Sequence, residues 1–132
     1  MKEVTNSQKL HGFSKEERLH SKKEIDALFT KGASFYLYPF SVRFLPRESA
    51  PSCHQVLISV SKRNFKRAVD RNRIKRLIRE SYRLNKQLLS DVDPYLSIAY
   101  IYTAKDILTF ALIEKKLIAS LKRLLSEKEK LV

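Results

Sequence analysis

Apolar residues recur along the chain with two different spacings, and these spacings predict where helices and strands lie. Within residues 22–31 the apolar positions that start at Ile25 follow an i, i+3, i+4 pattern, which is typical of one helix face. Ser21 precedes this segment in a Ser-x-x-Glu capping pattern, and Gly32 follows it where a left-handed helix C-cap is expected. The pattern therefore predicts a short helix over 22–31.

Three other segments, rich in apolar and aromatic residues, are predicted to be strands, and the second half of the first and all of the second alternate as strands do. The first runs from Phe35 to Leu45, the second from Gln55 to Ser61 and the third from Leu96 to Tyr102. Residues 46–51 begin and end with proline, which predicts a turn. We therefore expect the first two strands to pair antiparallel across this turn.

Two further helices are predicted. The first is long and strongly basic, lies between the second and third strands, and ends before Pro94. Thr109 can cap the second, at about 110–127, whose apolar stripe comprises Phe110, Ile113, Leu117, Leu121, Leu124 and Leu125. The element order α-β-β-α-β-α predicts an α+β sandwich in which helices pack on a small mixed or antiparallel sheet.

Length and composition predict a single domain. The 132 residues, 43% of them hydrophobic, contain no repeat and no Gly/Ser/Pro-rich linker, so we expect one domain over 1–132 with poorly ordered ends at 1–13 and 128–132. Cys53 is the only cysteine, which excludes an intrachain disulfide and suits a reducing cytoplasm. No apolar run approaches the ~18 residues that a membrane-spanning helix needs, so a cytoplasmic protein is expected.

The charge of the chain is unusual and points to a polyanionic partner. Lys and Arg number 27 against 14 Asp and Glu, which gives a formal net charge of +13. Eleven of these cations lie between Lys62 and Lys86, where only Asp70 and Glu80 oppose them. A field of one sign attracts polyanions, so nucleic acid is the leading candidate partner and an anionic membrane surface is the second.

A helical projection of the basic segment, at ~100° per residue, separates a side expected to be buried from a cationic side. The side expected to be buried contains Ile74, Leu77, Ile78, Ser81, Asn85 and Leu88. The opposite side contains Asn72, Lys75, Arg76, Arg79, Arg83 and Lys86, with Arg71 and Arg73 on its flanks. Like charges four residues apart cost roughly a few tenths of a kcal/mol, so this face favours a bound polyanion over a simply solvated helix surface. We therefore predict nucleic-acid contacts at Lys62, Arg63, Lys66, Arg67, Arg71, Asn72, Arg73, Lys75, Arg76, Arg79 and Arg83.

The middle of the basic segment resembles a known motif. The run Ala68–Glu80, Ala-Val-Asp-Arg-Asn-Arg-Ile-Lys-Arg-Leu-Ile-Arg-Glu, is similar to the Arg-Asn-Arg motif of the bacterial ribonuclease P protein subunit. It follows a strand that ends Ser-Val-Ser-Lys-Arg, and the remaining elements also come in the order of that family, so the resemblance covers nearly the whole chain. The stretch Asn64–Arg67 departs from the pattern, because many members have a glycine-containing turn there.

This resemblance implies a function and a fold. The family's subunit partners a catalytic RNA, and together they hydrolyse a phosphodiester of precursor tRNA and release its 5′ leader. The RNA carries the catalytic Mg²⁺ site, so the resemblance implies no catalytic or metal-binding residue on the protein. It also implies a left-handed βαβ crossover, which no sequence pattern predicts because ~98% of such crossovers are right-handed. The leader-binding cleft of the family maps onto Phe29, Phe40, Arg43, Ser59 and Lys75, although Phe29 and Phe40 could instead belong to the core.

The remaining candidate residues agree with a protein that is not itself a nuclease. His11, His20 and His54 are scattered and lack the spacing of metal ligands. Asp91 and Asp93, next to Pro94, predict a turn rather than a two-metal site. A general nucleic-acid-binding protein would explain the basic helix as well, but it would not explain the order of the other elements.

Overall fold

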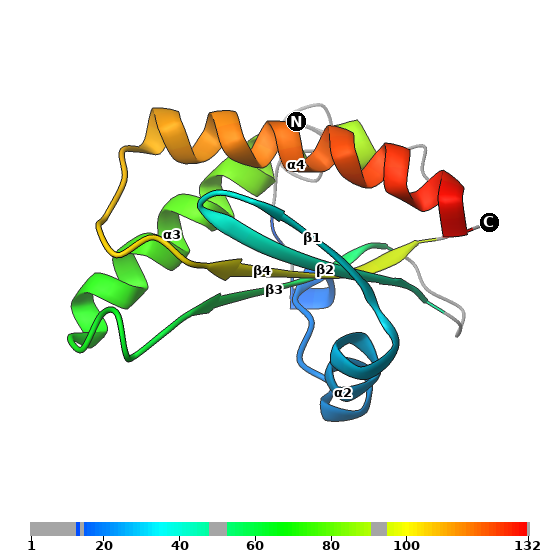
Figure 1. Cartoon of the computed structure of the whole chain (residues 1–132), viewed down its shortest axis with the longest axis horizontal. Helices are drawn as coiled ribbons and strands as arrows, with labels where there is room; N and C mark the ends of the chain where they lie inside the picture. The colour runs from blue at the N-terminus through cyan, green and yellow to red at the C-terminus, as the bar shows by residue number, and fades with distance from the viewer. Residues whose placement is uncertain (1–12, 14, 48–52, 91–94, 132) are drawn as a thin grey trace, which may run out of the picture.

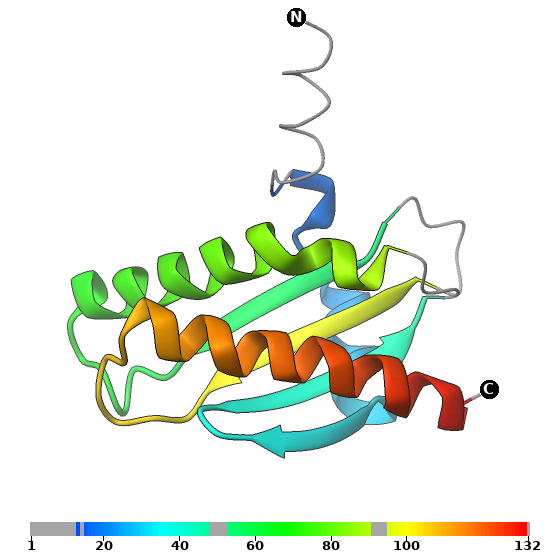
Figure 2. The same cartoon turned by 90° about the horizontal axis from the view of Figure 1, so that it is seen from above.

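The computed structural model describes residues 13, 15–47, 53–90 and 95–131, and their side chains as far as Glu127. A four-stranded sheet carries two long helices on one face and one short helix on the other (Figure 1, Figure 2). In chain order the elements are η1 (Lys15–Glu17), α2 (Lys22–Lys31), β1 (Ala33–Leu37), β2 (Phe40–Pro46), β3 (Gln55–Val60), α3 (Ala68–Asn85), η2 (Lys86–Leu89), β4 (Leu96–Tyr102) and α4 (Phe110–Leu131).

The sheet confirms the predicted α+β fold but differs from the prediction in its pairing. The segment predicted as one strand forms two, β1 and β2, which pair antiparallel around the cis Tyr38–Pro39 peptide bond. The predicted pairing of β2 with β3 is wrong, because β4 lies between them in the order β1-β2-β4-β3. β4 pairs antiparallel with β2 and parallel with β3. β4 is buried along nearly its whole length, as a central strand is. The alternation within β2 and β3 does not show which strand lies between them.

The connection from β3 through α3 to β4 has the uncommon hand. When β3 and β4 point upward and the helices lie in front of the sheet, β4 is to the left of β3, so the crossover is left-handed (Figure 2). This agrees with the fold implied by the family resemblance. It also places α3 over the outer edge of the sheet, where one of its sides remains accessible.

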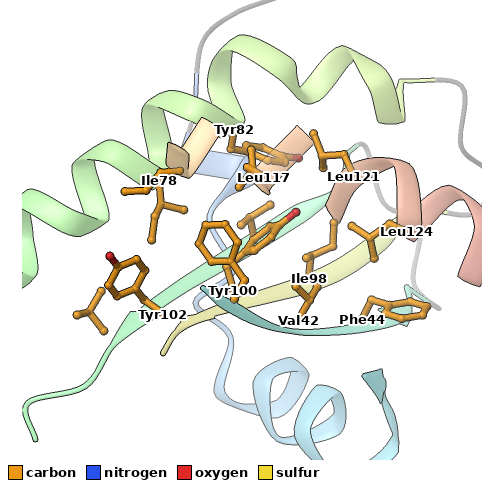
Figure 3. Packing of buried hydrophobic residues seen from close by; sticks show 14 of the residues in the cluster. Val42, Phe44, Ile78, Tyr82, Ile98, Tyr100, Tyr102, Leu117, Leu121 and Leu124 are labelled. Atoms are coloured by element: carbon orange, nitrogen blue, oxygen red, sulfur yellow. The ribbon is translucent and has the colours of Figure 1, made fainter. Parts of the chain in front are cut away.

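The main core lies between the sheet and the two long helices. Tyr100 is fully buried there, and its hydroxyl forms a 2.8 Å hydrogen bond with Ser120 Oγ. The predicted stripe of α4 is buried at four positions and half-buried at Phe110 and Leu125, while the helix continues past its predicted end to Leu131. Figure 3 shows the centre of this core, formed by Val42, Phe44, Ile78, Tyr82, Ile98, Tyr100, Tyr102, Leu117, Leu121 and Leu124.

The helix ends confirm two predicted caps and correct a third. Ser21 Oγ accepts from the backbone N–H of Glu24 at 3.4 Å, and Thr109 Oγ1 accepts from that of Leu112 at 3.3 Å. Gly32, predicted to be left-handed, has φ −70° and ψ 151°. Glycine is required there by space rather than torsion, because a Cβ atom would lie 2.3 Å from the carbonyl oxygen of Leu28.

Further contacts cover the outer edge of β3 and tie the end of η2 to the start of β4. Leu19 N–H donates to the carbonyl of Val56 at 3.0 Å, so the segment after η1 pairs briefly with β3 and covers its edge. His54 is buried, accepts from Leu96 N–H through Nδ1 at 2.9 Å, and donates through Nε2 to the carbonyl of Leu89 at 2.8 Å. This histidine therefore has a structural role.

Some predictions concern residues outside the described ranges. The expected turns at 46–51 and 91–94 fall largely there, as does the poor order expected of residues 1–12. Within the described part of the chain, no helix is both long and apolar enough to cross a membrane.

Candidate RNA interface

The exposed side of α3 forms a surface that we call the basic face, made of Asn72, Arg73, Lys75, Arg76 and Arg79. All are exposed except Lys75, which is half-buried. Ile74, Ile78 and Ser81 lie on the opposite side and are fully buried, so the predicted orientation of the helix is confirmed. Among the described residues, no acidic side chain forms a salt bridge with any cation of the basic face.

The buried side of α3 differs from the prediction near its C-terminus. Tyr82 is buried although it was not predicted to be, and its ring meets Phe13 edge-on at a centroid distance of 5.8 Å. Leu88, predicted to be buried, is 39% exposed, while Leu89 is fully buried. The cause is the 3-10 geometry of η2, whose three residues per turn shift the phase of the α-helical projection.

Two cations of the predicted RNA-binding set, and Lys86 beside them, make contacts within the protein. Lys86 forms a 2.7 Å salt bridge with Glu17, and both side chains are only 14% exposed, so this charge is paired within the protein and is not part of the basic face. Arg83 pairs with Glu80, and this hydrogen bond lowers the pKa of the Glu80 carboxyl below its ordinary value. Arg71 donates to the backbone carbonyls of Phe65 and Lys66 at 2.8 and 2.9 Å, so it also holds the preceding loop.

That loop, residues 61–67, adds four exposed cations to the start of α3. The helix of the basic segment begins at Ala68, so the first part of this segment is not helical. Phe65 is 7% exposed and packs on Tyr102 at a centroid distance of 6.0 Å, which anchors the loop where many family members have a glycine-containing turn. The exposed cations are Lys62, Arg63, Lys66 and Arg67. Their charge adds to the partial positive charge of the helix N-terminus.

A second candidate surface lies on the other side of the sheet. We call it the open face: the strand positions that point away from α3 and α4. Two rows of paired residues cross it, Ser34–Arg43–Ala99–Leu57 and Tyr36–Ser41–Ile101–Ser59. α2 lies on this side of the sheet (Figure 1) and packs on Ala99, Leu45 and Leu57, so it covers the first row in part. The residues of the second row are half-buried or exposed.

The open face brings together three of the predicted leader-binding residues. The guanidinium of Arg43 lies over the ring of Phe29, 5.4 Å from its centroid, and donates to the Phe29 carbonyl at 3.3 Å. Phe29 is 37% exposed, and Ser59 lies on the same face in the adjacent row. Lys75 comes from α3, in the opposite layer, and is therefore placed with the basic face.

The prediction that Phe40 lines the leader-binding cleft is wrong. Along β2 it shares a side with Val42 and Phe44, so it points into the main core and is fully buried. Its ring meets Tyr100 and Tyr102 edge-on at 5.3 and 6.3 Å. A nucleobase cannot reach this ring, and the alternative that Phe40 belongs to the core is correct.

The two surfaces belong to different layers but are joined by a short piece of chain. Ser59 ends the open face on β3, and the anchored loop 61–67 leads from there to the basic face on α3. Within the described residues, no three His, Cys, Asp or Glu side chains gather as a metal site would require. Fold and surfaces together define a class: small basic α+β proteins built on a left-handed βαβ crossover, with cations along the crossover helix.

Comparisons with known proteins identify the family. The family model for ribonuclease P matches residues 13–125. The ribonuclease P protein component of Porphyromonas gingivalis is 42% identical over 118 residues, 86% of each chain. That of Chromohalobacter salexigens is 40% identical over 82 residues, 62% of this chain and 63% of the relative.

Solved structures agree with this result. The RNase P protein of Staphylococcus aureus has a TM-score of 0.67 and 30% identity, covering 80% of this chain and 93% of its own. That of Thermotoga maritima has a TM-score of 0.68 and 27% identity, covering 81% and 96%. The chain belongs to the ribonuclease P protein family. Membership gives it the role of a protein subunit in tRNA processing and implies partnership with ribonuclease P RNA.

Proposed function

We propose that this chain binds ribonuclease P RNA through the basic face and holds the 5′ leader of precursor tRNA on the open face. In this way it assists the endonucleolytic removal of the leader and the formation of the mature tRNA 5′ end. The observation that carries the proposal is the basic face of α3, whose cations form no salt bridge with an acidic side chain among the described residues. The short loop 61–67 joins it to the partly uncovered open face. The complex acts as a hydrolase in the cytoplasm.

The basic face is suited to a phosphate backbone. Arginine presents a planar fork of donors that fits two oxygens of a phosphate, and three of its four cations are arginines. Bound phosphates would also relieve the repulsion between like charges four residues apart on the helix. Each phosphate contact adds about 0.7 to 0.9 to the magnitude of the salt slope of binding, so we expect a slope of several units.

The open face is suited to a single strand. Single-stranded RNA is bound by aromatic and guanidinium planes on which bases stack, together with nearby positive charge. The Phe29–Arg43 pair provides an aromatic ring and a guanidinium plane side by side. The Ser59 hydroxyl can donate to a base edge or a phosphate. Lys75 and the loop cations would attract the strand from the side of α3.

Mg²⁺ enters the proposal at the level of the ribonucleoprotein. The RNA binds most of it and carries the catalytic step, and the protein contributes affinity for substrate. The protein alone therefore requires no cofactor.

Reconstitution tests the proposal. Purified protein mixed with ribonuclease P RNA should raise cleavage of precursor tRNA at low Mg²⁺, and protein alone should cleave nothing. The double variant Arg76→Ala/Arg79→Ala should lose most of this stimulation. Lys115→Ala/Lys122→Ala is the matched control, because it removes the same charge from exposed positions of α4. Equal loss in both variants, or no stimulation by the unchanged protein, would contradict the proposal.

A further inference from the structure

Tyr36 is an exposed aromatic residue on the open face, outside the set of residues assigned to leader binding above. Its side chain is 56% exposed, whereas the preceding Phe35 is 7% exposed and points to the main core. Strand alternation therefore turns Tyr36 to the open face, in the second row, whose residues are half-buried or exposed. An aromatic ring of this size in such a position is a candidate contact surface rather than a core element.

Hydrogen bonds hold the ring across the sheet. The Tyr36 hydroxyl lies 3.1 Å from Thr103 Oγ1, and Thr103 Oγ1 donates its single proton to the Pro39 carbonyl at 3.0 Å. Tyr36 is therefore the donor in its bond to Thr103. Because β2 separates β1 from β4, the phenol must extend over β2, where the partner of Tyr36 is the small residue Ser41. The ring is laid along the open face with one side available.

Tyr36 lies on the same face of the sheet as the Phe29–Arg43 pair, and its ring extends toward Thr103, away from Arg43. Arg43 is two residues beyond Ser41 on β2, so the backbone positions of Arg43 and Tyr36 are diagonal neighbours, which are typically about 7–8 Å apart. The surroundings favour an anion, because the described strand residues of the open face include no acid. These residues are Ser34, Tyr36, Ser41, Arg43, Leu45, Gln55, Leu57, Ser59, Ser97, Ala99 and Ile101.

We propose that Tyr36 is a second base-stacking site for single-stranded RNA, on which one nucleobase of the precursor-tRNA leader stacks beside the base held at Phe29 and Arg43. This inference rests on the proposed function and extends the leader-binding surface to β1, the edge strand of the sheet. The bond to Thr103 fixes the ring before RNA binds, so little rotamer freedom remains to be lost on binding.

The test uses the reconstituted complex of protein and ribonuclease P RNA, with precursor tRNA and leaderless mature tRNA as ligands. Tyr36→Ala should weaken precursor binding about 5- to 20-fold, the lower part of the range for a base–aromatic stack, and leave mature tRNA binding unchanged. Tyr36→Phe retains the ring and should bind within about twofold of the unchanged protein. Leu112→Ala, an exposed apolar position on α4, is the control and should have no effect.

A scan of the leader gives a measurement that does not depend on any variant folding. Abasic nucleotides placed one at a time in the leader should weaken binding to the unchanged complex at two separate positions. One of these losses should disappear in Tyr36→Ala. The inference is overturned if only one position responds, if Tyr36→Ala matches the unchanged protein, or if Tyr36→Phe loses as much as Tyr36→Ala. If the unchanged complex binds precursor and mature tRNA equally, the proposed leader binding itself fails.

Discussion

Replacing Arg79 by alanine should weaken RNA binding without disturbing the fold. Arg79 lies on the exposed side of α3 and forms no salt bridge with any described residue, so its removal breaks no internal contact. Its neighbour Ile78 is fully buried in the main core. Substitutions at Arg79 and Ile78 therefore test the exposed side and the buried side of α3 at adjacent positions.

The magnitudes follow from these surroundings. Loss of one phosphate contact lowers the magnitude of the salt slope by about 0.7 to 0.9, which at 0.1 M monovalent salt corresponds to about a 5- to 8-fold loss of affinity. An exposed substitution away from special features changes the free energy of unfolding by no more than about 0.5 kcal/mol. Ile78→Ala, by contrast, should lower the free energy of unfolding by about 2–5 kcal/mol. Leu77, which is only half-buried, should cost less than Ile78.

Two measurements check this prediction. Binding of ribonuclease P RNA is titrated over a range of salt concentrations, and urea unfolding is followed for each variant, with Lys122→Ala as the control for charge. The reasoning about α3 would be refuted if Arg79→Ala unfolded the protein while Ile78→Ala did not. It would also be refuted if Arg79→Ala and the unchanged protein had the same salt slope.

Three further changes have definite expected outcomes. Gly32→Ala should lower the free energy of unfolding, measured by urea denaturation, by about 1–3 kcal/mol, because the new methyl group meets the backbone of the preceding helix. An unchanged urea midpoint would show that the end of this helix can shift to make room. His54→Ala should lower it by about 2–5 kcal/mol, because two buried backbone groups lose their partner, and unchanged melting would contradict the structural role of this histidine. Glu80→Gln removes the negative charge that pairs with Arg83, so it should raise the magnitude of the RNA salt slope by up to about 0.9. A smaller slope would mean that the pair itself contacts RNA. Because the pKa of Glu80 is lowered in the folded state, any stability from this pair is present above the unfolded-state pKa and is lost as pH falls through the folded-state value; acid titration of Glu80→Gln should lack this component.

Local pattern was enough to predict the helices but not the order of the strands. The bounds of α2 and β4 and the buried side of α3 all follow from apolar spacing and capping residues. The position of β4 between β2 and β3 depends on contacts between segments far apart in sequence, which alternation within one strand cannot encode. The handedness of the crossover is equally a property of the assembled layers.

The sequence predicted the position of a site residue correctly only where that position is set by the pattern within one helix or strand, and not where it depends on contacts between elements. Phe40 shows the difference, because its alternation with Val42 and Phe44 already indicated the core, and only the family resemblance favoured the cleft. Lys86 looks like part of the cationic side in projection, but its salt bridge partner, Glu17, is 69 residues away. Strand alternation places Tyr36 on the face opposite to Phe35, but its exposure depends on how far α2 extends over the sheet, which local pattern does not predict.

The anchored loop between β3 and α3 has a consequence for how two RNA molecules are held relative to each other. Phe65 is buried at its centre and Arg71 bonds two of its carbonyls, so the loop cannot extend without breaking the fold. If the proposed RNA binding is correct, the spacing between an RNA on the basic face and a leader on the open face would be set by the folded protein rather than by either RNA. An inserted residue in 61–67 should displace the leader relative to the catalytic RNA, and we expect such a change to alter which phosphodiester is cut.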